Sequence, residues 1–190
     1  MQEQIFEDKE YNKQDFVKLG LDKGEYNFCK FVDCNFSEIN LSDFKFIDCR
    51  FENCDLSNCK LENTAMQDIK FENCKLFGLI FADCNDFLFS VSFTDCQLNF
   101  SSFYKRKIKN TLFKNCNLTE VDFVETDLSA CKFENCDLKR ASFDNTILEK
   151  TDFTSSYNYS INPNFNRMKK AKFSKDGIIG LLDNLDIIIK

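Results

Sequence analysis

A large apolar residue occurs at every fifth position along most of this 190-residue chain. A first run begins at Phe6 and continues without a gap to Phe81. A second run, shifted by two residues, resumes at Leu88 and continues to Phe153. On an α-helix these residues would spiral around the whole surface, and on a strand an odd spacing would send them to alternate faces. Each group of five residues must therefore contain a bend.

The residue two positions before most of the large ones is small or apolar, as Cys54 is before Leu56. Residues two apart on an extended segment point the same way, so each group of five supplies one large and one small inward side chain. The outward positions are rich in Asn, Asp, Glu and Ser. Asn and Asp suit a corner because they tolerate turn conformations. Four such corners close a coil of twenty residues.

This pattern predicts an all-β fold, a right-handed, four-sided β-helix with coils stacked about 4.8 Å apart. It covers residues 1–173 with about eight and a half coils, a register slip near 84–88 and an irregular coil near 155–166. At this spacing the rod is roughly 40 Å long, and its stability is nearly additive along the coils. We expect a structural core that includes Phe93, Phe103, Phe113, Phe123, Phe133, Phe143 and Phe153.

Residues 174–190 follow a different pattern and form a second unit. Ser174 fits an N-cap, and the residues that follow it recur on one face of a short helix. A short apolar strand comes next. One interpretation is a lid over the last coil, and the other is a two-fold dimer interface; the two are compatible. The interface residues would be Ile178, Leu181, Leu182, Leu185, Ile187, Ile188 and Ile189.

The chain offers little for catalysis or metal binding. It contains no His for acid–base chemistry and no glycine-rich phosphate loop, so we expect no enzymatic activity, no cofactor and no metal. The 11 Cys residues fall mostly at the small inward position, where they act as buried fillers. The alternative is disulfide bonding, because stacking brings residues such as Cys34 and Cys54 near 5 Å apart.

The formal net charge of −6 favours a protein partner with a basic face over direct nucleic-acid binding. No secretory signal and no membrane-spanning apolar stretch is visible. We therefore expect a cytoplasmic protein.

Two stretches are candidate partner sites. The densest acidic run contains Glu120, Asp122, Glu125, Asp127, Glu134 and Asp137, and its first four members are the partner-binding candidates; it faces a basic partner, or it is an ordinary solvated part of the repeat. Around the slip, the candidates are Asp86, Phe87 and Phe89, close in sequence to the outward apolar residues Phe77, Ile80 and Phe100. Exposed aromatic residues indicate contact, whereas the alternative is packing beneath the bulge. The basic run at residues 105–107 is interpreted as a solvated face.

Residues 54–58 (Cys-Asp-Leu-Ser-Asn) and 136–140 (Cys-Asp-Leu-Lys-Arg) resemble the motif of the pentapeptide-repeat superfamily, in which a small residue precedes Asp or Asn, then Leu or Phe, then two polar residues. The resemblance covers about residues 6–173. Within the superfamily the chain resembles the Qnr-type quinolone-resistance proteins. These end in a short helix with paired leucines and a brief apolar strand, as residues 181–182 and 187–189 do here.

The resemblance implies a homodimeric rod that resembles DNA, binds DNA gyrase or topoisomerase IV and protects it from fluoroquinolones. Many Qnr-type proteins carry two long loops, whereas this chain shows only a two-residue slip. A 40 Å duplex also carries roughly 24 negative charges, so any mimicry by this chain rests on shape and local patches. The alternative function is a non-enzymatic pentapeptide-repeat scaffold that binds an unrelated protein.

Overall fold

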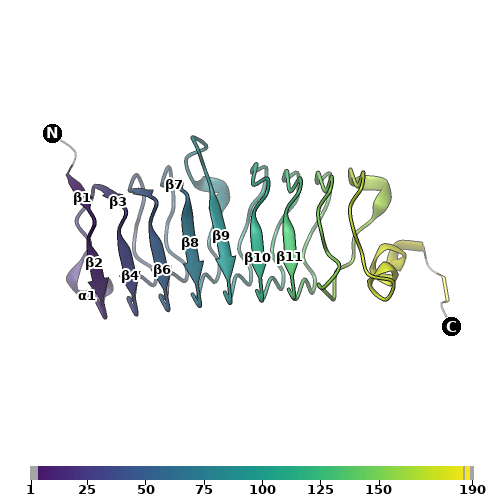
Figure 1. Ribbon diagram of the computed structural model, residues 1–190, viewed down its shortest axis with the longest axis horizontal. Coiled ribbons are helices and arrows are strands. Elements are labelled where there is room, and N and C mark those ends of the chain that lie inside the picture. The colour runs from purple at the N-terminus through teal and green to yellow at the C-terminus, as the bar shows by residue number, and fades with distance from the viewer. Residues whose placement is uncertain (1–3, 186, 189–190) are drawn as a thin grey trace.

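The chain winds into an elongated solenoid, with β1 at one end and the C-terminal helical turns at the other (Figure 1). This computed structural model describes residues 4–185 and 187–188. Every strand pair in the described part of the chain is parallel, and residues twenty apart lie side by side in successive coils. The predicted all-β quadrilateral β-helix is confirmed.

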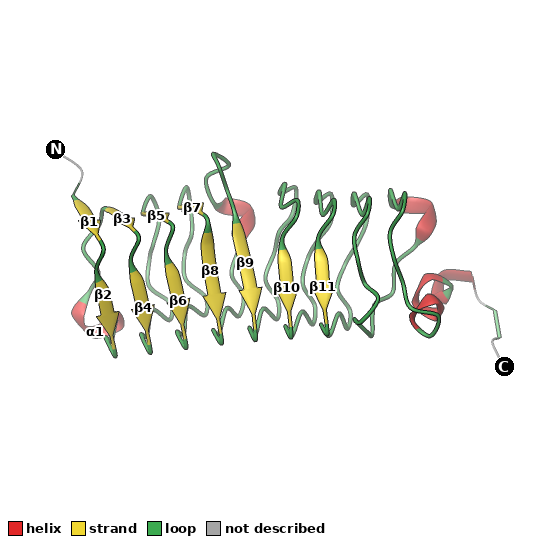
Figure 2. Ribbon diagram, viewed as in Figure 1, coloured by secondary structure: helices red, strands yellow, loops and turns green. Residues whose placement is uncertain are grey.

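Two of the four faces carry regular strands (Figure 2). Face 1 is a four-stranded sheet of β1 (Ile5–Glu7), β3 (Glu25–Asn27), β5 (Lys45–Ile47) and β7 (Ala65–Gln67). Face 2 is a seven-stranded sheet of β2 (Glu10–Asn12), β4 (Lys30–Val32), β6 (Arg50–Glu52), β8 (Ile69–Glu72), β9 (Val91–Thr94), β10 (Leu112–Lys114) and β11 (Lys132–Glu134).

The other two faces are joined by isolated parallel bridges. Face 3 contains the ladder that runs from Asp15 through Asn35 to Tyr157, and face 4 contains the ladder Ile80, Ser102, Asp122 and Ser142. The four-residue helix α1 (Phe16–Leu19) and the 3-10 turns η1 (Phe81–Asp83) and η2 (Pro163–Phe165) interrupt these faces. Regular strands therefore cover fewer coils than the eight and a half predicted, and bridges continue the stacking beyond β11.

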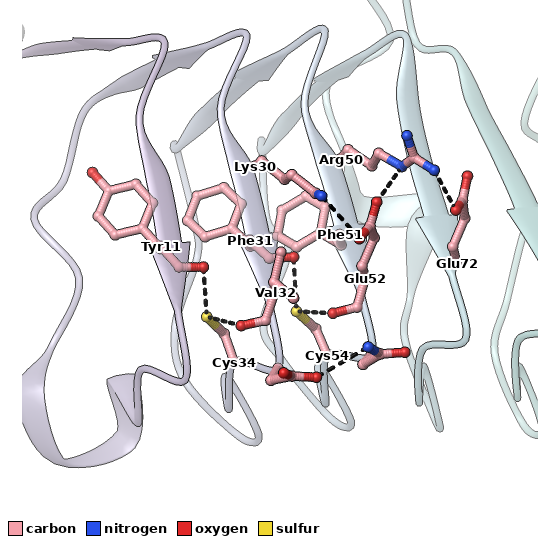
Figure 3. A network of polar contacts seen from close by, with 12 residues as sticks. Tyr11, Lys30, Phe31, Val32, Cys34, Arg50, Phe51, Glu52, Cys54 and Glu72 are labelled. Atoms are coloured by element: carbon pink, nitrogen blue, oxygen red, sulfur yellow. Dashed lines mark hydrogen bonds and ion pairs between the residues drawn. The ribbon is translucent and has the colours of Figure 1, made fainter.

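An aromatic column runs through the core behind face 2. Tyr11, Phe31 and Phe51 stack with ring centroids 4.9 and 4.8 Å apart, as Figure 3 shows. The stack continues to Phe173, which lies 5.4 Å from Phe153. Rings from other faces meet this column edge-on, and the seven phenylalanines predicted for the core are all at most 4% exposed. Burying so many rings supplies most of the hydrophobic stabilisation of the rod.

The small inward residues satisfy their polar atoms on the preceding coil. The Cys34 thiol donates to the carbonyl oxygen of Tyr11, and the Cys54 thiol to that of Phe31 (Figure 3). Buried threonines do the same; the Thr64 hydroxyl donates to Leu41 O at 2.8 Å. A small side chain with one donor fits this position because the buried donor would otherwise lose its hydrogen bond to water.

The corners use left-handed backbone conformations. The residue two after each large one has a φ near +55° in most coils, for example Asn53, Asn58 and Asn73. Asn tolerates this region better than other non-glycine residues. The corner amides also form ladders, since Asn73 Nδ2 donates to Asn53 Oδ1 at 2.8 Å. The sequence preference for Asn and Asp thus has a backbone cause and a side-chain cause.

The irregular segment at 155–166 keeps the length of a normal coil, because Asp152 still pairs with Lys172 and Ile147 with Arg167. Tyr159 and Ile161 turn inward and are buried. The segment is a modified coil rather than an insertion.

The C-terminal segment forms two 3-10 turns, η3 (Gly177–Leu181) and η4 (Asp183–Leu185), rather than one continuous amphipathic helix. Ser174 Oγ accepts a hydrogen bond from Gly177 N, as an N-cap would. Gly180 approaches the last coil so closely that a Cβ there would lie 2.1 Å from Tyr159 O. None of the helices in the described residues is long and apolar enough to cross a membrane.

Candidate protein-binding face and projecting loop

Residues 84–90 form a loop that projects from the rod just before β9, above the neighbouring turns (Figure 1). The loop lies over β7, since Asn85 N donates to Thr64 O and Ser90 N to Met66 O. It therefore ends the regular sheet on face 1. The two extra residues are accommodated here, because β8 and β9 pair with an offset of 22 residues.

The prediction that Leu88 restarts the core pattern is wrong. Its side chain is 64% exposed, its φ is +54°, and the neighbouring Phe87 is 68% exposed. Phe89 turns inward instead and contacts Phe81 edge-on at 6.4 Å. The inward register resumes at Val91 and Phe93. Of the aromatic residues expected to be exposed in this loop, Phe87 is exposed and Phe89 is half-buried.

Arg106 holds the loop in place from inside the solenoid. It occupies the small inward position two before Ile108, and only 4% of its surface is exposed. Its guanidinium donates to Cys84 O at 2.8 Å and to Asn85 O at 3.0 Å. It also pairs with the Asp86 carboxylate and stacks over the Phe89 ring at 4.2 Å.

The interpretation of residues 105–107 as a solvated basic face is therefore wrong for Arg106. The physical reason is the loop, which presents two backbone carbonyls and a ring to the guanidinium. A sequence signal for this role exists: an arginine stands where the repeat calls for a small residue. The pairing with a loop some twenty residues away could not be read from that signal.

Face 4 and its corner with face 1 carry more acidic than basic side chains. The ladders along this face bring together Asp22, Asp43, Glu62, Asp83, Asp122, Glu125 and Asp144. Their basic neighbours on the same face are Lys23, Lys60 and Lys105. Seven acidic and three basic side chains give face 4 a net charge of −4, most of the formal charge of the whole chain.

The predicted acidic run wraps across this face rather than forming one compact cluster. Asp122 and Glu125 lie on face 4, whereas Glu120 is on its corner with face 3 and Asp127 is on face 1. Three of the four carboxylates have cationic partners: Glu120 pairs with Arg140, Glu125 with Lys105 and Asp127 with Lys109.

Asp127 is more buried than Glu120 and Glu125. Burial alone would raise its pKa, but hydrogen bonds from Ser129 and the nearby Lys109 outweigh that effect and hold the pKa below its usual value. Asp127 is thus ionised at neutral pH and engaged within the rod. Asp122 and Glu125 are the better placed of the run to meet a partner.

The predicted dimer residues lie at the C-terminal end of the rod. Ile178, Leu185, Ile187 and Ile188 are exposed, with Ile188 at 88%, whereas Leu181 packs against the core and Leu182 is half-buried. Ile187 and Ile188 do not form a strand within the described residues, and Ile189 lies outside them.

All 11 cysteines are buried free thiols, so the disulfide alternative is not realised. Among the described residues, no group of His, Cys, Asp or Glu is arranged to hold a metal ion. Burial raises the pKa of the Cys59 and Cys131 thiols to about 12. These two thiols are therefore protonated fillers at neutral pH.

Comparisons with known proteins agree with this architecture. The profile described as "Pentapeptide repeat region" matches residues 24–85 and 87–159, and its two matches are separated within the projecting loop. No curated protein sequence matches the chain. A trypsin-treated structure of QnrB1, a plasmid-mediated fluoroquinolone resistance protein, superposes with a TM-score of 0.57 at 16% identity, covering 98% of both chains.

HetL, a pentapeptide repeat protein involved in heterocyst differentiation regulation in the cyanobacterium Nostoc sp. strain PCC 7120, gives a TM-score of 0.44 at 15% identity over 91% of this chain and 90% of HetL. At such identities the QnrB1 likeness shows a shared fold. The profile match covers well over half of the residues. The chain belongs to the pentapeptide-repeat family.

Proposed function

We propose that this chain is a Qnr-type protein that binds a type II topoisomerase, DNA gyrase or topoisomerase IV, and protects it from fluoroquinolones. Face 4 would occupy part of the enzyme's DNA-binding surface. The observation that carries the proposal is the net negative charge of this one face of a straight rod, with the projecting loop at its edge.

The spacing of charge supports this use of face 4. Seven carboxylates over seven coils amount to about one per 4.8 Å, and a single DNA strand carries one phosphate per 3.4 Å. The whole chain has far too little charge to match a duplex, and the three lysines of face 4 leave it about one net negative charge per 8 Å, so the likeness to one strand lies in the spacing of the carboxylates rather than in the charge density. A basic enzyme groove would attract this face at long range and orient the rod.

The projecting loop and the C-terminal end also have roles in the proposed function. Asp86 and Phe87 at the loop would contact the enzyme beside face 4, and Asp122 and Glu125 would contact it on the face itself. The exposed isoleucines of the C-terminal end would join two rods about a two-fold axis, which is the commonest symmetry of soluble oligomers.

A supercoiling assay tests the proposal directly. The purified chain should restore gyrase supercoiling in the presence of a fluoroquinolone. A triple variant of face 4, Glu62→Gln with Asp122→Asn and Glu125→Gln, should lose that rescue. A matched triple variant of face 2, Glu52→Gln with Glu72→Gln and Glu134→Gln, should keep it. No rescue by the unmodified chain at any ratio of protein to enzyme would remove the proposal.

A non-enzymatic scaffold for an unrelated protein is the second candidate. The small size of the projecting loop favours it, since residues 84–90 include only two residues more than the repeat requires. If the unmodified chain binds neither gyrase nor topoisomerase IV, this second function becomes the better account of the acidic face.

A further inference from the structure

Apolar side chains gather on the corner between faces 3 and 4, at the level of the register slip. Ile80 is 40% exposed, Phe100 is 58% exposed and Phe77 is half-buried beside them. The two coils that carry them are adjacent, because Gly78 N donates to Asn99 O at 3.0 Å and Ile80 pairs with Ser102. These three residues, on two adjacent coils, are here called the apolar corner.

Phe100 is an unfavourable residue for its position. It occupies a left-handed corner with a φ of +62°, where Asn58 stands two coils earlier in the same column. Bulky residues at positive φ are strained, and the exposed ring gains nothing from burial. Phe28 is likewise exposed at a left-handed corner, so what distinguishes Phe100 is its place on the coil next to that of Phe77 and Ile80.

Acidic side chains flank the apolar corner along the rod. Glu62 lies on face 4 in the coil before Ile80, and Asp122 lies on it in the coil after Phe100, with Lys60 and Lys105 on the same face. Beside Ile80, a shallow hollow is lined by Gly78, Lys60 and Glu62, among others. An apolar centre within a charged rim is the usual layout of a protein-binding surface.

We propose that the apolar corner binds an exposed apolar side chain of the partner, set between lysines and arginines that face the acidic rim. This inference rests on the proposed function and specifies which part of the topoisomerase surface the rod needs. Charge complementarity selects a basic protein, since a nucleic acid would be repelled by the rim. The contact gives the rod a hydrophobic anchor that a DNA backbone does not have.

The test is the substitution Phe100→Asn in the full chain. Asn tolerates the left-handed corner, so Tm should rise by about 2–4 °C, which also shows that the variant folds. Its affinity for purified gyrase, measured by titration calorimetry, should fall at least tenfold. The control is Phe28→Asn, at a corner with a φ of +55° between faces 1 and 2. This control should raise Tm similarly and leave the affinity unchanged.

The salt dependence of binding distinguishes the contribution of the apolar corner from that of the acidic side chains around it. The affinity of the unmodified chain should fall with ionic strength, because the rim is charged and exposed. The Phe100→Asn variant should bind more weakly, but its affinity should depend on ionic strength as that of the unmodified chain does. In the double variant Glu62→Gln with Asp122→Asn, the affinity should depend less on ionic strength. Unchanged affinity of Phe100→Asn overturns this inference and leaves the proposed function standing. Failure of the unmodified chain to bind gyrase or topoisomerase IV overturns both.

Discussion

At the scale of single residues, one arginine determines the shape of the most irregular part of the rod. Arg106 supplies hydrogen bonds to two loop carbonyls that would otherwise be buried without a donor. The ion pair of Arg106 with Asp86 stabilises the loop less than these hydrogen bonds do, because the carboxylate side chain is 94% exposed and well solvated. The stabilisation therefore comes from the backbone contacts and the stacking on Phe89.

Replacing Arg106 with Met should lower the free energy of unfolding by about 2 kcal/mol, since two carbonyls lose their partners. It should also open the loop, so that limited chymotrypsin digestion cuts after Phe87 or Leu88 at least tenfold faster. The control Asp86→Asn should change the free energy of unfolding by less than about 0.5 kcal/mol, because that side chain is exposed. Equal effects of the two substitutions would contradict this account of the loop.

The buried thiols make stability depend on alkaline pH. An unfolded thiol ionises with a pKa near 8.5, whereas burial raises the pKa of Cys59 and Cys131 to about 12. Between these values the unfolded chain releases protons that the folded chain retains. Stability should therefore be intact below about pH 8.5 and fall by about 1.4 kcal/mol per pH unit for each such thiol above it.

Denaturant unfolding at several pH values between 8.5 and 10.5 checks this effect. The double variant Cys59→Ala with Cys131→Ala should lose stability less steeply, by about 2.7 kcal/mol per pH unit. The pair Thr64→Ala with Thr126→Ala removes hydroxyl groups from equivalent inward positions, which do not titrate in this range. It should lower stability without changing the slope, and identical slopes for both pairs would refute the burial of the thiols.

At the scale of elements, the faces and the core could be predicted because one contact repeats. Each large inward residue, such as Phe113, stacks on the residue twenty before it or after it, so the five-residue period alone fixes its place. The loop could not be predicted in the same way. Leu88 and Phe89 are both apolar, and the contact with Arg106 from the next coil decides which of them turns inward.

The form of the C-terminal segment could not be predicted from its sequence pattern either. The spacing of its apolar residues is helical, but Gly177 and Gly180 lie against Tyr159 so closely that side chains there would clash. This packing on the last coil accompanies two short 3-10 turns in place of one helix. The apolar spacing predicts a helical segment here. The close approach of its glycines to Tyr159, which is distant in the sequence, could not be predicted from that spacing.

Removing residues 174–190 tests whether this segment joins two chains. Light scattering on the full chain should give the mass of two chains, because the exposed isoleucines would be buried at a two-fold contact. The truncated chain should give the mass of one. A milder change, Ile178→Ser with Ile188→Ser, keeps the cap on Tyr159 and should also give monomers. A monomeric full chain would exclude the dimer.

At the scale of the whole molecule, charge is distributed unevenly over a uniform shape. Seven carboxylates and three lysines lie on face 4, whereas face 2 pairs its acidic and basic rows, as in the contacts of Lys30 and Arg50 with Glu52 (Figure 3). Neighbouring opposite charges on face 2 cancel at a distance, so a basic partner experiences mainly face 4. This charge distribution supports the proposal that face 4 lies along a groove that holds DNA.

Displacement of DNA from a topoisomerase tests this central claim most directly. The fluorescence anisotropy of a labelled duplex bound to gyrase would be followed as the full chain is added at constant ionic strength. We predict a complete return to the anisotropy of free DNA, with a midpoint that rises in proportion to the competing DNA concentration. Anisotropy that stays high or increases, as when DNA and the rod bind gyrase together, would contradict the claim that face 4 occupies the DNA-binding surface.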